Sequence, residues 1–227
     1  MNKPQSYDAV VIGGGIFGCY SALYLSNKGY RVLLLEKESK CFQKASLVNQ
    51  ARLHSGYHYP RSIHTAKQAN EHRERFLMDH QQFINNTFTK YYAVSKHLSS
   101  THSLRFEHFC NYLNIKCQKA PSSSMFNTSQ MEALYLTEEY SFDTFLLQNL
   151  YKQKVDNATN IDTFLSSTVT HVEKDSHNFL ISLKNTKEYL IQTPMVINAA
   201  YTGINAINQL FQQPAIETVY ELTEVCL

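Results

Sequence analysis

The chain has 227 residues, a formal net charge of +2 from 21 basic and 19 acidic side chains, and 43% hydrophobic residues. That length can bury the core of one large domain or two small ones. No apolar run approaches the roughly 18 residues of a membrane-spanning helix, and no long basic block indicates a nucleic-acid partner. Because no secretory signal is visible and the five cysteines contain no C-x-x-C spacing, we expect a cytoplasmic protein with reduced thiols and no metal site.

The first predicted elements are a strand, a glycine-rich turn and a helix. An apolar strand covers residues 7–12, the run Gly13 to Gly18 follows the pattern G-x-G-x-x-G, and a helix extends from Gly15 to about Lys28, before Gly29. In this pattern the first glycine allows a tight turn, the second lets a pyrophosphate approach the backbone, and the third lets the helix lie against the strand. The amides at the start of the helix then face the phosphates.

A second predicted strand, Arg31 to Leu35, ends in Glu36. An acidic residue at this spacing accepts hydrogen bonds from ribose hydroxyls and repels a 2′-phosphate, so the pattern favours FAD or NAD over NADP. An NAD-dependent dehydrogenase would usually continue with regular βαβ units, which the sequence after Glu36 does not indicate.

The middle of the chain predicts loops and helices. A polar loop covers residues 37–48, and the segment Asn49 to Ser62 is rich in His, Tyr and Arg, as is typical of loops that line sites. Apolar periodicity predicts a long helix from Ser62, a strand over 90–96 and a helix over 101–113 whose apolar face carries Phe106, Phe109, Cys110 and Leu113.

The later elements are shorter. We expect a short strand over 134–137, then a helix capped by Ser141 with Phe142, Phe145, Leu146 and Leu150 on one face. Alternating strands over 163–172, 178–183 and 189–193 predict a β-meander. An apolar strand over 195–200 is expected to return to the parallel sheet, and a last strand is expected over 218–227.

These residues resemble the FAD-dependent oxidoreductases of the D-amino-acid oxidase superfamily, which includes glycine and sarcosine oxidases, glycerol-3-phosphate dehydrogenases and L-2-hydroxyglutarate dehydrogenases. The resemblance rests on YDAVVIGGGIFG, RVLLLEKE, ASLVNQARLHSGYHYPRS and PMVINAA. The third of these is most similar to the hydroxyglutarate dehydrogenase branch, through Asn49, His54, Ser55, Gly56, Tyr57 and Tyr59. Members of the superfamily continue well beyond the point that corresponds to Leu227, so the resemblance implies a fragment or a truncated product.

The resemblance implies an α/β fold with two parts. A Rossmann-like FAD-binding domain with a parallel sheet and a β-meander would comprise residues 1–85 and 156–215. An inserted, incomplete α+β substrate domain would comprise residues 86–155, and residues 216–227 would begin the return to it.

The resemblance also implies the site residues. The expected FAD-binding residues are Gly13, Gly14, Gly15, Ile16, Phe17, Gly18, Glu36, Lys37, Ser46, Asn49, Gln50, Val169, Ala199 and Ala200. The loop of residues 49–59 would pass beside the flavin ring, with His54 and His58 as candidate bases. Arg52, Tyr57 and Arg61 are the candidate substrate-binding residues, because a guanidinium can hold a carboxylate through two hydrogen bonds. Packing for Tyr57 and solvent exposure for Arg61 are the alternatives.

The first functional hypothesis is hydride transfer to FAD from the carbon that bears the amine or hydroxyl of a small amino acid, amine or 2-hydroxy acid. Oxygen or a quinone would then accept the electrons. One alternative is a flavin-dependent enzyme without net redox change, such as a sugar mutase. Another is a truncated, non-catalytic FAD-binding protein whose sheet is completed by a partner or a missing segment.

Overall fold

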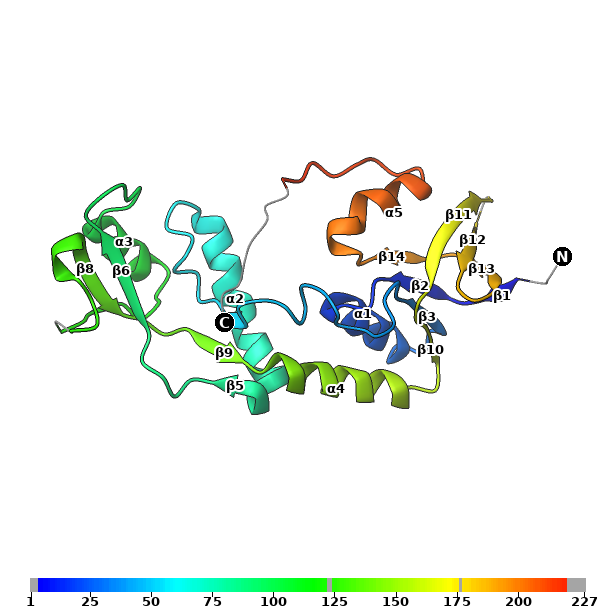
Figure 1. Cartoon of the computed structure of the whole chain (residues 1–227), viewed down its shortest axis with the longest axis horizontal. Helices are drawn as coiled ribbons and strands as arrows, with labels where there is room; N and C mark the ends of the chain where they lie inside the picture. Colours follow the sequence, from blue (N-terminus) through cyan, green and yellow to red (C-terminus); the bar gives the residue numbers. More distant parts are fainter. Residues whose placement is uncertain (1–3, 122–123, 176, 220–227) are drawn as a thin grey trace. The chain divides into compact units, whose positions relative to one another are not determined.

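The computed structural model of the chain describes residues 4–121, 124–175 and 177–219. The chain divides into two compact units (Figure 1). The first unit comprises the residues up to Gln50 and from Thr144 onward, and the second unit comprises Ala51–Asp143. The chain therefore begins in the first unit, leaves it once to form the second, and returns.

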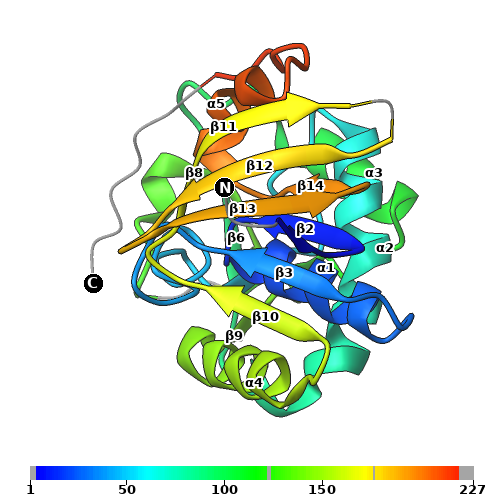
Figure 2. The ribbon, with the colours of Figure 1, turned by 90° about the vertical axis from the view of Figure 1, so that its right-hand side faces the viewer.

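A four-stranded parallel sheet, in the order β10-β3-β2-β14, forms the centre of the first unit (Figure 2). Its strands are β2 (Ala9–Ile12), β3 (Val32–Leu35), β10 (Ile161–Phe164) and β14 (Val196–Asn198). Every residue of β2 and β3 is buried, as their unbroken apolar runs predict for central strands covered on both faces. Because β14 pairs with β2, the predicted return of the late apolar strand to the sheet is confirmed.

Helix α1 (Ile16–Ser26) follows β2 directly and contacts β2, β3 and helix α4 (Thr144–Asn157). Its buried residues are Gly18, Cys19, Ala22 and Leu25. After α1 the chain reverses at Gly29, whose φ of +88° is the left-handed conformation that glycine adopts without steric cost. The predicted helix and its C-terminal glycine are confirmed.

The helix predicted with Ser141 as its cap begins later than expected. Ser141 lies in strand β9 (Tyr140–Phe142) of the second unit, and α4 begins at Thr144. The buried face of α4 consists of Leu147, Tyr151 and Val155. Phe145 and Leu146, which the predicted apolar face included, are exposed. The prediction was wrong because several apolar stripes fit a helical period in this segment, and only tertiary packing selects one of them.

A second sheet of the first unit has the order β1-β13-β12-β11. Its strands are β1 (Gln5–Ser6), β11 (Thr168–Lys174), β12 (Phe179–Lys184) and β13 (Glu188–Thr193). The last three pair antiparallel in succession, which confirms the β-meander. Side chains of both sheets share one core, which includes Val10, Leu33, Ile181 and Ile191. Helix α5 (Ile204–Leu210), which was not predicted, contacts β11 and β14.

The single strand predicted over residues 163–172 is two strands in two different sheets. β10 pairs parallel with β3, whereas β11 pairs antiparallel with β12. The chain turns between them at Ser166, which has a φ of +50°, and the amide of Ser167 donates to the carbonyl of Glu36 (2.9 Å). The prediction was wrong because this turn contains neither glycine nor proline, the residues that usually mark a break in sequence.

The second unit contains two antiparallel three-stranded sheets among its described residues. The strands in spatial order are β4 (Arg52–Leu53), β9 and β5 (Ile84–Asn85) in one sheet, and β6 (Tyr91–Ser95), β8 (Met131–Leu136) and β7 (Gln118–Lys119) in the other. The helices are α2 (Ile63–His80) and α3 (Ser103–Tyr112), with short 3-10 turns at Gln81–Phe83 and Thr128–Gln130. Phe106, Phe109 and Cys110 are buried, so the predicted apolar face of α3 is confirmed.

Some expectations concern residues at the edge of the described range. The predicted strand over 218–227 and Cys226 lie outside the described residues, apart from 218 and 219, which form no strand. The four cysteines that the structure describes are free thiols. Within residues 4–121, 124–175 and 177–219, no helix is both long and apolar enough to cross a membrane.

Leu147→Ala should destabilise the first unit by about 2–5 kcal/mol, because the Leu147 side chain is fully buried and its truncation leaves a cavity. The neighbouring substitution Leu146→Ala removes the same atoms from a side chain that is 47% exposed, and should cost less than about 1 kcal/mol. Urea unfolding of the two variants measures both free energies. Equal losses would contradict the helix face that the structure assigns.

Candidate functional site

The glycine-rich turn between β2 and α1 is closed by short backbone contacts. Gly13 has a φ of +110°, and a Cβ at Gly13 would lie 2.5 Å from the carbonyl oxygen of Ala199. A Cβ on Gly18 would lie 1.7 Å from the carbonyl oxygen of Gly13. Separations this short exclude a side chain at both positions. The two glycines therefore fix where the N-terminus of α1 is presented.

Side chains from two neighbouring segments bind amides of this turn. The amide of Gly14 donates to Oε2 of Glu36 (2.6 Å), and Oε1 of Glu36 accepts from the amide of Glu38 (2.8 Å). The amide of Ile16 donates to Oγ of Ser46 (2.9 Å). The structure thus brings together the residues Gly13–Gly18, Glu36 and Ser46, which we call the cradle.

The other residues expected at the cofactor occupy different environments. Ala199 and Ala200 lie against Gly13. The side-chain amide of Asn49 donates to the carbonyls of Ala45 (3.0 Å) and Ser46 (3.2 Å), and so ties together the loop that carries Ser46. The exposed residues of this set are Phe17, Lys37 and Gln50, and Val169 is buried in β11.

Two thiols that the sequence did not single out lie beneath the cradle. Sγ of Cys19 lies 3.6 Å from the carbonyl oxygen of Gly14, and a Cβ on Gly14 would lie 2.7 Å from Sγ of Cys41. A hydrogen bond between the thiols and burial together raise the pKa of Cys19, while the hydrogen bond from Cys19 lowers the pKa of Cys41. The pair fills the space beside Gly14.

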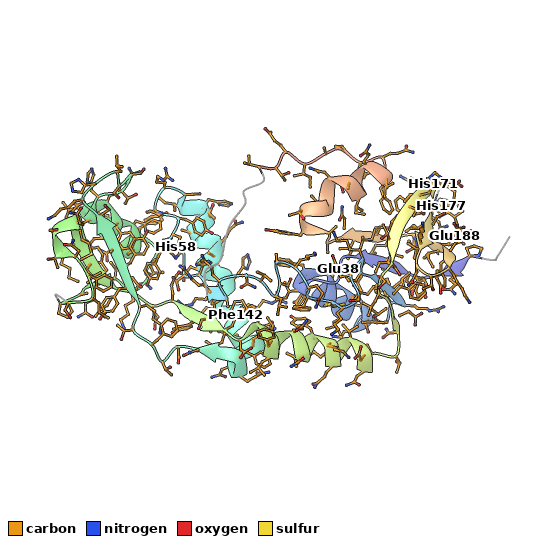
Figure 3. The ribbon with its side chains drawn as sticks, in the orientation of Figure 1. Glu38, His58, Phe142, His171, His177 and Glu188 are labelled. Carbon is orange, nitrogen blue, oxygen red and sulfur yellow. The ribbon has the colours of Figure 1, made fainter. Side chains whose placement is uncertain are left out.

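A cluster of two histidines and a glutamate lies in the second unit, where His58 extends from the loop between β4 and α2 (Figure 3). Nδ1 of His54 lies 3.3 Å from Oε1 of Glu139, and Nε2 of His58 lies 3.3 Å from Oε2 of the same carboxylate. Burial alone would raise the pKa of Glu139, but hydrogen bonds with His54 and His58 outweigh it and lower the pKa to about 2. These three residues are the His–His–Glu cluster, and they are close enough to hold a metal ion.

The candidate substrate residues near this cluster differ in environment. Nη1 of Arg52 lies 3.3 Å from Nε2 of His58. Tyr57 is buried, and its hydroxyl donates to the carbonyl of Lys116 (2.5 Å) and accepts from the amide of Glu138 (3.1 Å). Burial raises the pKa of Tyr57 above its usual range. These contacts favour a packing role for Tyr57 over contact with a substrate.

A cavity of about 260 Å³ adjoins the cluster within the second unit. Its lining includes His58, Arg61, Tyr92, Thr101 and Phe106. The cavity therefore combines an imidazole and a guanidinium with aromatic faces, which suits a small anion with an apolar part.

Sequence reasoning missed three residues that support the loop of His54 and His58. Glu139 precedes β9 and is distant in sequence from the histidines. Ser55 is fully buried, and its hydroxyl donates to the carbonyl of Glu138 (2.7 Å) and accepts from Nη1 of Arg73 (2.6 Å). The signals in the sequence were that Ser55 belongs to the segment that carries the family resemblance, and that Arg73 interrupts the apolar face of the predicted helix.

Comparisons with known proteins identify relatives that are considerably longer than this chain. The FAD-dependent monooxygenase FPY4 of Fusarium mangiferae is 37% identical over 84 residues, which are 37% of this chain and 23% of that protein. The FAD-dependent monooxygenase kojA of Aspergillus flavus is 28% identical over 167 residues, which are 71% of this chain and 39% of that protein. The chain thus spans well under half the length of these curated relatives.

Solved structures with the same fold include glycine oxidase of Geobacillus kaustophilus, with a TM-score of 0.72 and 13% identity over 92% of this chain and 59% of that one. L-α-glycerophosphate oxidase of Mycoplasma pneumoniae, with FAD bound, has a TM-score of 0.71 and 17% identity over 91% of this chain and 57% of that one. The family model of the FAD dependent oxidoreductases called DAO matches residues 8–219. The chain therefore belongs to the DAO family of FAD-dependent oxidoreductases.

Proposed function

We propose that the first unit is an FAD-binding domain, that the second unit is part of a substrate domain, and that the whole protein oxidises a small amino acid, amine or 2-hydroxy acid. The observation that carries this proposal is the cradle. Its turn excludes side chains at Gly13 and Gly18, and the amide of Gly14 in this turn donates to the carboxylate of Glu36, which follows β3. A pyrophosphate needs those amides, and ribose hydroxyls need that carboxylate.

The residues of the cradle fit FAD. Gly15 would let the pyrophosphate approach the backbone of the turn that Gly13 and Gly18 allow, and Glu36 would accept the hydrogen bonds of the adenosine ribose. Ser46, now bound to the amide of Ile16, is suited to the phosphate region. When bound, FAD supplies a two-electron acceptor for hydride from the substrate carbon.

The second unit supplies groups for binding and proton removal. Arg61 lines the cavity beside His58, and its guanidinium can hold a substrate carboxylate through two hydrogen bonds. If the substrate is a 2-hydroxy acid, its hydroxyl proton needs a base. We favour His54, because the contact of its Nδ1 with Glu139 leaves Nε2 directed elsewhere and fixes the ring, as a carboxylate does for a catalytic imidazole.

Two other functions are distinguishable from this one. The names of the two fungal relatives favour a monooxygenase, whose product would carry an oxygen atom from O2. A rearrangement without net oxidation would return the cofactor unchanged.

Anaerobic mixing of the FAD-loaded protein with 2-hydroxy acids, amino acids and amines distinguishes these functions. 2-Hydroxyglutarate is the first substrate to test, because the loop of residues 49–59 resembles that of the L-2-hydroxyglutarate dehydrogenase branch. Bleaching of the flavin without oxygen supports the proposed oxidation, and no bleaching with any of them contradicts it.

His54→Ala should slow anaerobic flavin reduction by a 2-hydroxy acid at least about 100-fold, because general-base catalysis contributes roughly that much or more. His102→Ala is the matched control, because His102 is an exposed histidine of the same unit. Its Nδ1 lies 3.4 Å from the carboxylate of Glu132. Stopped-flow absorbance measures both rates. A full rate in His54→Ala would remove His54 from the role of base.

Glu36→Gln should weaken FAD binding about 10- to 100-fold, because hydrogen bonds to a charged group contribute about 1.5–3 kcal/mol. Glu38→Gln is the control, because the Glu38 carboxylate points to Lys44 (3.1 Å) and only its amide contacts Glu36. Quenching of flavin fluorescence on binding gives both affinities. Equal affinities in the two variants would show that Glu36 does not hold the cofactor.

A further inference from the structure

The His–His–Glu cluster presents three potential metal donors that converge from separate parts of the chain. One ring nitrogen of His54, one of His58 and a carboxylate oxygen of Glu139 all lie within 4.8 Å of one another. The histidines belong to the loop between β4 and α2, whereas Glu139 precedes β9. We propose that the cluster is a binding site for a divalent transition-metal ion of the zinc class.

The geometry is close to that of a metal site. A tetrahedral site with bonds of about 2.0–2.2 Å places neighbouring donor atoms roughly 3.3–3.6 Å apart. Both histidine–glutamate separations are already 3.3 Å. The two separations end on different oxygens of Glu139, so a site with one carboxylate ligand atom also requires a small rotation of the carboxylate or of one imidazole. The two imidazole side chains, each 35% exposed, have room to turn. Two histidines and one carboxylate leave a fourth position open for water or another ligand, as in catalytic zinc sites.

The charges around the cluster also suit a cation. Glu139 is only 14% exposed and offers its carboxylate oxygens toward both imidazoles. Nη1 of Arg52 lies 3.3 Å from Nε2 of His58, the nitrogen that would bind the metal. Because Arg52 is exposed, its guanidinium can move into solvent when a metal takes its place. Arg52 therefore competes with the metal.

Among the residues that the structure describes, the other histidine–carboxylate pairs lack a third donor. His102 lies 3.4 Å from Glu132, and His171 lies 3.4 Å from Glu173. Within the described part of the chain, the His–His–Glu cluster alone brings three such donors together. The exposed pair of His102 and Glu132 is consequently a matched control within the second unit.

The metal proposal does not rest on the proposed oxidation. The metal site and the proposed oxidation are linked through His54. An imidazole that binds a metal through Nδ1 is no longer oriented by Glu139, and it cannot accept a proton as a free base does. Occupancy of the cluster would then slow the oxidation rather than assist it.

Titration of the full chain with ZnCl2 in a calorimeter, repeated at several pH values because metal binding by imidazole depends on pH, tests the proposal. We expect one tight equivalent of zinc. Glu139→Gln should weaken binding at least about tenfold, as loss of a ligand does, whereas Glu132→Gln should leave it unchanged. Arg52→Ala should tighten binding, which general damage to the fold would not do.

Three results would overturn the proposal. These are no binding by the unchanged chain, equal affinity in Glu139→Gln and Glu132→Gln, or weaker binding in Arg52→Ala. His58→Ala, a change at the exposed surface, replaces Glu139→Gln if that variant does not fold, as judged by circular dichroism. If the chain binds zinc but neither binds FAD nor supports its reduction by a substrate, the proposed function is contradicted and the metal site is not. If a substrate reduces the bound flavin but the chain binds no zinc, the metal site is contradicted and the proposed function is not.

Discussion

The contact between Gly18 of α1 and the carbonyl of Gly13 is the constraint on which the first unit depends. A Cβ at Gly18 would lie 1.7 Å from that oxygen, so the helix can follow β2 this closely only with glycine there. In the turn before α1, the amide of Gly14 donates to the carboxylate of Glu36 at the end of β3. On the other side of the turn, Ala199 after β14 closes against Gly13. The chain segments that follow β2, β3 and β14 thus meet at the cradle. This arrangement agrees with the membership of the chain in the DAO family of FAD-dependent oxidoreductases.

The second unit is organised by buried polar contacts rather than by glycine. The hydroxyls of Ser55 and Tyr57 bind the backbone around Glu138, and this holds the loop of His54 and His58 against the segment that carries Glu139. A partly buried carboxylate needs hydrogen-bond partners, and here the two imidazoles lie 3.3 Å from its oxygens. The same arrangement makes the cluster suitable for orienting a base or for binding a cation, and these two uses exclude each other at a given moment.

Sequence reasoning was strongest where structure is local. The strand, turn and helix around Gly13 and the acidic end of β3 follow from apolar runs and glycine spacing, and all were confirmed. It failed where tertiary packing decides. Periodicity could not choose between the stripes of α4, and the turn at Ser166 carries no marker residue. Glu139 could not be assigned to the histidines because its distance from them in sequence gives no spacing to interpret.

The central claim is that the cradle holds FAD, and the visible absorption spectrum of the chain purified without added cofactor tests it most directly. Heat denaturation and identification of the released molecule complete the measurement. The account predicts a flavin spectrum and release of FAD in a ratio near one per chain. A colourless protein that also fails to take up added FAD would contradict it, and would leave the cradle as a structural turn that binds no cofactor.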